Sequence, residues 1–179
     1  GRIRPEKGTD LFVETMLTIM PQKPSMVALI IGKTENKHKK FKEKLIKKIA
    51  KANLSDRIIF MDEISAENMP KVMSAISLLI ALPRYEGYGM TPLEALASGT
   101  PFVGSKTGYF EEFSSHGKYG SVVELEDVAN AAKAVLHWLS KNDELDIFSE
   151  ISRKYILENY SIEQEVNGIN KAYLSLLKD

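Results

Sequence analysis

The sequence has no cysteine, only three histidines and no long apolar run. The absence of cysteine excludes a disulfide framework and thiolate metal sites, and three dispersed histidines argue against a metal site built from imidazoles. The longest apolar run covers residues 77–83, far short of the ~20 residues that span a bilayer. An Asp-x-Asp motif is also absent. We therefore expect no bound metal ion and no cofactor.

An excess of charge of one sign is lacking as well, because 24 Lys and Arg balance 24 Asp and Glu. This balance argues against a general nucleic-acid-binding surface, and we expect no nucleic-acid partner. Hydrophobic residues make up 44% of the chain and charged residues 27%, close to the globular averages, which excludes a disordered chain. The 179 residues fit one domain, residues 1–179, with a substantial core.

Short apolar segments alternate with amphipathic helical segments along the chain. Strands are expected at residues 26–31, 57–61, 77–82, 101–104 and 121–123. Helices are expected at residues 9–20, 36–52, 66–75, 91–98, 126–140, 144–159 and 162–177. This alternation predicts an α/β fold with a single Rossmann-like, doubly wound parallel sheet.

Two loops lie at the carboxyl ends of strands, where such sheets bind their ligands. The first, residues 1–8, precedes a helix. Gly8 and Thr9 offer backbone N–H groups at the helix start, and Arg2 and Lys7 add charges that suit a phosphate or diphosphate. An ordinary solvated basic turn is the alternative interpretation.

The second loop, residues 83–94, leaves the most apolar strand and enters a helix. Gly87 and Gly89 allow the backbone to approach a ligand closely. Thr91 and Glu94 fit the N-cap and N3 positions of a capping box, which would explain Glu94 without any ligand.

Glu86 in the same loop has no such structural explanation. It lies at the carboxyl end of a strand, where its carboxylate can accept hydrogen bonds from sugar hydroxyl groups. An exposed acidic residue in a turn is the alternative.

Together the two loops resemble the C-terminal, donor-binding half of GT-B-fold glycosyltransferases of the retaining family 4. Arg2 and Lys7 have the spacing of the family's G-R-x4-K-G motif, and Glu86 and Glu94 form its E-x7-E motif. The segment EGYGMTPLEALASGTPFVGSKTG matches almost without interruption. The resemblance covers essentially the whole chain, and the run GRIRPEKGTDLFVETM makes it most similar to lipopolysaccharide core mannosyltransferases.

The resemblance implies transfer of a hexose from a nucleotide-sugar donor with retention of configuration and without a metal ion. The expected donor is GDP-mannose and the expected acceptor a lipopolysaccharide-core or similar glycan. A UDP-sugar donor stays open, because nothing in these motifs reads the base. A non-catalytic nucleotide-binding fragment is a further alternative.

The resemblance also implies a role for each motif residue. Arg2 and Lys7 would hold the diphosphate and stabilise charge on the leaving group, and Glu86 would bind hydroxyls of the donor sugar. Thr91 would contact the diphosphate, and Glu94 would bind the ribose. Four residues would present their backbone beside sugar and phosphate: Gly87, Tyr88, Gly89 and Met90.

Two positions depart from the family's pattern. Asp62 stands where members often carry glycine, a change that a left-handed Asp would tolerate. Gly108 is followed by Tyr109 in place of a second glycine, which we expect to narrow the sugar pocket.

The resemblance further implies that an acceptor-binding N-terminal domain and most of a first strand belong before Gly1. We therefore expect a fragment that lacks transferase activity alone, binds nucleoside diphosphate weakly, and meets its glycan or glycolipid acceptor through the absent domain. A cytoplasmic location, peripheral at the inner face of the cytoplasmic membrane, is the matching expectation.

Residues 33–51 form a strongly basic segment. Nine Lys against two Glu give it a charge of +7, so the rest of the chain carries −7. Phe41, Leu45 and Ile49 are spaced to pack one face of a helix on the sheet. The remaining face is either a solvated surface or a docking surface for an anionic membrane.

Overall fold

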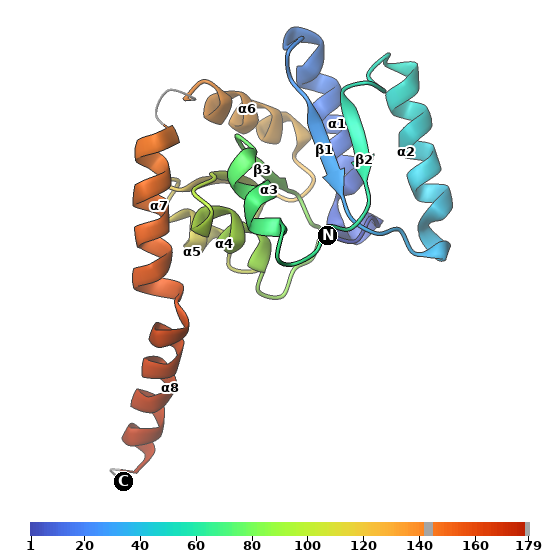
Figure 1. Cartoon of the computed structure of the whole chain (residues 1–179). Coiled ribbons are helices and arrows are strands. Elements are labelled where there is room, and N and C mark those ends of the chain that lie inside the picture. The colour runs from blue at the N-terminus through green and yellow to red at the C-terminus, as the bar shows by residue number, and fades with distance from the viewer. Residues whose placement is uncertain (142–144, 178–179) are drawn as a thin grey trace.

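The structure is a computed structural model that describes residues 1–141 and 145–177. Its strands are parallel, and most of its helices gather around them (Figure 1). The strands are β1 (Ala28–Ile31), β2 (Ile58–Met61), β3 (Leu79–Ala81), β4 (Phe102–Ser105) and β5 (Gly120–Val123). The α/β class with parallel strands is therefore confirmed.

The strands form two hydrogen-bonded groups instead of one continuous sheet. One group pairs β1 with β2, and the other has the order β3-β4-β5. The facing edges of β1 and β3 are separated by a cavity lined by residues of both strands. The expected single sheet is thus divided between β1 and β3, the two strands beside the first loop.

The helices agree closely with those expected. They are α1 (Thr9–Ile19), α2 (Lys39–Lys51), α3 (Met69–Ala75), α4 (Met90–Ala97), α5 (Phe110–Ser114), α6 (Val128–Leu139), α7 (Leu145–Tyr160) and α8 (Ile162–Leu176). Short 3₁₀ turns occur at η1 (Pro5–Lys7), η2 (Met20–Gln22) and η3 (Asn36–His38). The sequence interpretation missed α5, which has only five residues. It placed the start of α3 too early, because the helix begins just before Pro70. The expected start of α7 at residue 144 lies outside the described residues.

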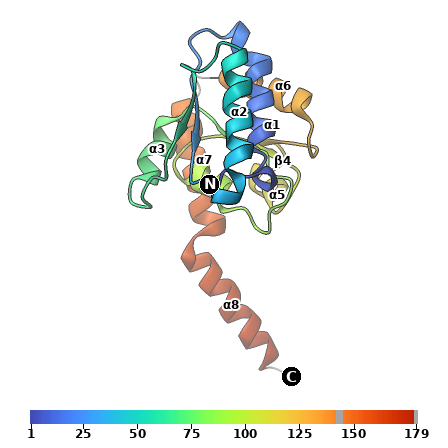
Figure 2. The same cartoon turned by 90° about the vertical axis from the view of Figure 1, so that its right-hand side faces the viewer.

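The largest core cluster joins α1, α2 and α6 to the strands, and it includes Leu45 and Ile49 with Phe41 packed against it. The predicted apolar stripe of the basic helix is therefore confirmed. A second cluster surrounds Phe102 and Phe110. Helix α8 contributes no buried residue and projects from the body of the molecule, as Figure 2 shows from the side.

Candidate functional site

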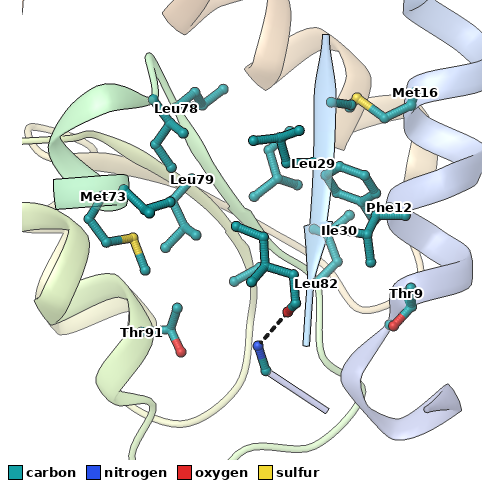
Figure 3. A pocket seen from close by; sticks show the side chains of 18 of the residues that line it. Thr9, Phe12, Met16, Leu29, Ile30, Met73, Leu78, Leu79, Leu82 and Thr91 are labelled. Carbon is teal, nitrogen blue, oxygen red and sulfur yellow. Dashed lines mark hydrogen bonds between the residues drawn. The ribbon is translucent and has the colours of Figure 1, made fainter. Parts of the chain in front are cut away.

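A cavity of about 750 Å³ lies between β1 and β3 and extends to the carboxyl ends of these strands. Figure 3 shows side chains of α1 on one side of it, side chains of α3 and β3 on the other, and those of β1 between. Most of the wall is therefore apolar. The predicted site residues that line the cavity are Arg2, Lys7, Glu86, Thr91 and Glu94. The structure thus brings the two predicted loops together around one space.

Lys7 and Glu86 form the closest contact between the two loops. The Nζ atom of Lys7 lies 2.6 Å from Oε2 of Glu86, and the side chains are 32% and 23% exposed. A phosphate group would replace Glu86 as the partner of Lys7. Hydroxyl groups would replace Lys7 as the partner of Glu86. The pair is consequently suited to a ligand that carries both groups.

Local backbone geometry fixes Lys7. The turn η1 ends on Gly8, whose φ of 65° is left-handed and whose N–H donates to the Pro5 carbonyl over 2.9 Å. A Cβ on Gly8 would lie 1.7 Å from the Leu82 carbonyl oxygen, so only glycine fits between η1 and the end of β3. Gly8 is also the N-cap of α1, so Lys7 lies directly before a helix N-terminus.

Hydrogen bonds with β4 and with the residues after it hold Glu86 in place. Its backbone N–H donates to Oγ1 of Thr107 over 3.1 Å. Three residues earlier, the Pro83 carbonyl accepts a 2.5 Å hydrogen bond from Oγ of the buried Ser105. The loop that carries Glu86 is thereby tied to the neighbouring strand β4 and the residues after it.

Arg2 lines the same cavity but points to a different partner. Its Nη1 lies 3.2 Å from Oε1 of Glu35, and its side chain is largely exposed. The predicted pairing of Arg2 with Lys7 on one anion would require Arg2 to leave Glu35.

Four predicted residues in the second loop do not line the cavity: Gly87, Tyr88, Gly89 and Met90. Gly89 has a φ of 95°, and a Cβ there would lie 2.3 Å from the Phe110 ring. The group that lies close to the Gly89 backbone is thus the Phe110 ring, where a ligand was expected. Gly87 has open space around its Cα and no positive φ.

The predicted capping box is wrong. Helix α4 begins at Met90 and its N-cap is the left-handed Gly89, without a side-chain cap hydrogen bond. Thr91 therefore lies inside the first turn at N2, and Glu94 lies two positions beyond N3. Both side chains are exposed. Glu94 thus loses its purely structural explanation.

The two departures from the family pattern are accommodated without a special turn or a blocked cavity. Asp62 has no positive φ, so it forms its turn in an ordinary backbone conformation. The Tyr109 ring packs against that of Tyr88 at a tilt of 45°, with 5.1 Å between the ring centroids, and it does not line the cavity. The expected narrowing by Tyr109 is not seen in this cavity.

Sequence reasoning missed Arg84 and Asp10. Arg84, near the start of the second loop, forms a bidentate ion pair with Asp10 of α1, with N–O distances of 2.9 and 2.8 Å. Burial raises the pKa of Asp10, but hydrogen bonds and charge from Arg84 outweigh it and hold that pKa below its usual value. Hydrogen bonds to Asp10 raise the pKa of Arg84 in turn. The available signal was that Arg84 follows the most apolar strand closely, at the carboxyl end where such sheets bind ligands.

Within residues 1–141 and 145–177, no three His, Cys, Asp or Glu side chains gather closely enough to hold a metal ion. In the same part of the chain, no helix combines the length and the apolar character needed to cross a bilayer.

Comparison with known proteins gives the class of protein that this fold and site define. The chain matches the family described as Glycosyl transferases group 1 over residues 1–172, and it belongs to that family. It is 35% identical over 180 residues to the lipopolysaccharide core biosynthesis mannosyltransferase LpsB of Rhizobium meliloti (strain 1021), covering 99% of this chain and 51% of the relative. The chain thus spans about half the length of the curated relatives it matches first.

Solved structures give the same fold. The C-terminal domain of a glycosyl transferase group 1 family protein (LpcC) from Francisella tularensis superposes with a TM-score of 0.83 at 26% identity, over 90% of this chain and 84% of that one. Anabaena Alr3699/HepE in complex with UDP superposes with a TM-score of 0.86 at 19% identity, over 98% of this chain and 47% of that one. The resemblance found in the sequence is confirmed.

Proposed function

We propose that the chain is the donor-binding half of a retaining glycosyltransferase that transfers mannose from GDP-mannose to a lipopolysaccharide-core or similar glycan acceptor. The observation that carries the proposal is the Lys7–Glu86 ion pair in a cavity that also holds Glu94. The mannosyltransferase relative at 35% identity supports mannose as the sugar.

In the proposed reaction the bond between the anomeric carbon and the phosphate oxygen breaks, and the diphosphate leaves with the electron pair. An acceptor hydroxyl oxygen forms the new bond to the anomeric carbon on the same face and gives its proton to the departing phosphate oxygen. Lys7 stabilises the growing negative charge, and Arg2 joins it after leaving Glu35. Glu86, released from Lys7, accepts hydrogen bonds from hydroxyls of the sugar. Glu94, free of any capping role, accepts hydrogen bonds from the ribose. None of these steps needs a metal ion.

A UDP-sugar is the second candidate donor. The Anabaena structure with a similar fold contains UDP. The side chains that line the cavity beside Lys7 and Glu86 include no group that selects guanine over uracil by an evident hydrogen-bond pattern. A donor titration is therefore the direct way to decide.

We also propose that a preceding strand and an N-terminal acceptor domain complete the enzyme, which leaves residues 1–179 inactive alone. The unjoined edges of β1 and β3 support this part of the proposal. The N–H groups of Gly1 and Ile3 donate to the carbonyls of Ile31 and Lys33, each over 2.9 Å. The two donors are two residues apart and so are the two acceptors, as in a parallel ladder. A strand that continued this ladder before Gly1 would enter the cavity between β1 and β3.

Calorimetric titration of residues 1–179 with GDP, GDP-mannose, UDP and UDP-glucose tests the donor. We expect GDP and GDP-mannose to bind more tightly than the two uridine compounds. Absence of heat with all four would overturn the nucleotide-binding proposal, and preference for the uridine pair would replace mannose with a UDP-sugar. In a two-domain protein, Lys7→Ala and Glu86→Ala should each abolish most turnover.

We further propose that the basic segment, residues 33–51, docks the enzyme on an anionic membrane where a glycolipid acceptor lies. Eight of its nine Lys are exposed, while Lys42 lies over the Phe60 ring. Each Lys near such a surface contributes roughly 1 kcal/mol. A solvated surface is the alternative interpretation of these exposed Lys, and vesicle binding tests one against the other.

Co-sedimentation with vesicles provides that test. Replacing Lys39, Lys40, Lys44 and Lys47 with Gln should reduce pelleting with anionic vesicles. The matched control replaces four exposed Lys elsewhere, Lys71, Lys118, Lys133 and Lys154, and removes the same charge. Equal losses in both variants, or equal pelleting with neutral vesicles, would retire the docking surface.

A further inference from the structure

Arg84 makes more contacts between the two loops than any other side chain described above. Its Nη1 and Nη2 donate to the two carboxylate oxygens of Asp10 over 2.9 and 2.8 Å. Nη1 also donates to the Pro5 carbonyl over 2.6 Å, and Nε lies 2.5 Å from Oε1 of Glu126. The backbone N–H of Arg84 donates to the Glu6 carbonyl over 2.9 Å. The residue therefore uses its main chain and its whole guanidinium group.

These contacts reach both members of the ion pair at the cavity. Pro5 and Glu6 belong to the same 3₁₀ turn as Lys7. Arg84 itself precedes Glu86 by two residues. The other hydrogen bond at Glu86, from its N–H to Thr107, leads away from the first loop. Apart from the Lys7–Glu86 ion pair itself, the hydrogen bonds that join the two loops in the described part of the chain all come from Arg84.

The chemistry of this connection is specific to arginine. A guanidinium group is planar and presents its N–H donors in a fixed fork, so it can hold a carboxylate with two bonds and a carbonyl with another. A lysine would keep the charge but would lose the bidentate geometry. Arg84 and Asp10 are 31% and 29% exposed, so water screens their contact only in part.

We propose that Arg84 is a positioning residue of the nucleotide-sugar site, and that its contacts with Asp10 and Pro5 set the spacing between Lys7 and Glu86. This inference rests on the proposed function for the identity of the ligand. A diphosphate that enters beside Lys7 separates it from Glu86. Arg84 keeps the two loops in place when that ion pair is broken.

The first arm of the test needs no ligand. Amide hydrogen exchange is measured on residues 1–179 with Arg84→Lys and, separately, Asp10→Asn. Both variants should exchange the N–H groups of Gly8 and Glu86 about tenfold faster, while Val103 in β4 stays unchanged. Unchanged exchange at Gly8 and Glu86 in both variants would overturn the inference.

The second arm uses GDP and UDP as probes. Arg84→Lys should weaken binding of the better ligand about tenfold. The double variant Arg84→Lys/Asp10→Asn should weaken it no further, because both substitutions disrupt the same contact between residues 84 and 10. Glu126→Gln is the matched control and should stay within twofold of the unchanged chain, since Glu126 contacts Arg84 from outside both loops. Wild-type affinity in Arg84→Lys would overturn the inference.

A third readout separates positioning from general stability. At saturating GDP, the ³¹P chemical shift of the β-phosphate reports its contact with Lys7. The shift should move in Arg84→Lys and coincide with that of the unchanged chain in Glu126→Gln. An unmoved shift in Arg84→Lys would overturn the positioning role. If the unchanged chain binds neither nucleotide, the proposed function fails, and the exchange arm alone decides on Arg84.

Discussion

Lys7 and Glu86, 79 residues apart in the sequence, satisfy each other across the cavity with 2.6 Å between Nζ and Oε2. Each side chain is therefore occupied by the other before a ligand arrives. A nucleotide-sugar that binds here exchanges one ion pair for two sets of contacts, from phosphate to Lys7 and from sugar hydroxyls to Glu86. The energetic consequence differs between GDP, which offers only the phosphate, and GDP-mannose, which offers both.

The first prediction follows from this difference. Glu86→Gln should raise the affinity for GDP severalfold, because Lys7 no longer gives up a carboxylate partner and a negative charge beside the phosphates is removed. The advantage of GDP-mannose over GDP should shrink in the same variant, because the amide is a weaker acceptor for sugar hydroxyls. Calorimetric titration with both ligands measures each change. A lower GDP affinity in Glu86→Gln would contradict the competition between carboxylate and phosphate.

The second prediction concerns Gly8. Gly8→Ala should destabilise the chain by at least about 2 kcal/mol, because alanine is strained at a φ of 65° and its Cβ would collide with the Leu82 carbonyl. That loss corresponds to a Tm lower by about 4 to 8 °C for a chain of this size. Thermal unfolding followed by circular dichroism measures it.

Gly168 offers the matched control for Gly8. It lies within α8, has no positive φ, and a Cβ there would meet no atom within 4 Å. Gly168→Ala should be neutral or stabilising by up to ~1 kcal/mol. Similar Tm losses in the two variants would show that the close approach at Gly8 is not what the loop requires.

The third prediction is a pH dependence at Asp10. The pKa of Asp10 is lowered in the folded chain, so its ion pair with Arg84 stabilises the fold fully above the unfolded pKa of about 3.9. This contribution should disappear as the pH falls through the lower, folded pKa. The stability difference between the unchanged chain and Asp10→Asn should therefore be constant from about pH 5 to 7 and shrink below pH 4. Urea unfolding at a series of pH values measures it, and a difference that grows towards low pH would refute the argument.

Much of the fold was predictable because it depends on local periodicity. The apolar spacing of Phe41, Leu45 and Ile49 defined the buried face of α2, and those side chains pack as expected. The pair of Arg84 and Asp10 was not predictable in this way, because 74 residues separate the partners. The start of α4 was misplaced because Thr91 has the local pattern of an N-cap, whereas Phe110 and the backbone of Gly89 decide the helix start.

The meeting of the two loops at one cavity was predictable for a different reason. Lys7, Glu86 and Glu94 are recognisable from motif spacing, and the topology of parallel strands brings their loops to one end. The same motif predicts that the backbone of residues 87–90 contacts the ligand, but these residues do not line the cavity. Arg2 was found by its spacing, yet its contact with Glu35 depends on a residue outside either motif.

The last prediction tests the open edges of β1 and β3. Ala28 and Gly32 donate to β2, and Leu79 donates to the residue before β4. Because neighbouring residues of a strand point their N–H groups to opposite sides, Leu29 and Ile31 face the cavity from β1, and Ile80 and Leu82 face it from the other side. These four N–H groups should exchange nearly as fast as in an unstructured chain.

A strand placed before Gly1 should protect them. We expect the prefix Val-Ile-Val-Leu-Val to slow their exchange at least 100-fold and to raise Tm, because it joins the two strand groups and buries apolar side chains on both faces. The control prefix Val-Ile-Val-Pro-Val has nearly the same apolar surface. Its proline stands two residues before Gly1 and removes the N–H that would donate to the Leu29 carbonyl, so it should protect far less. Equal protection by both prefixes would reduce the effect to unspecific burial. Protection that is already present without a prefix and grows with protein concentration would instead assign the gap to a second copy of the chain.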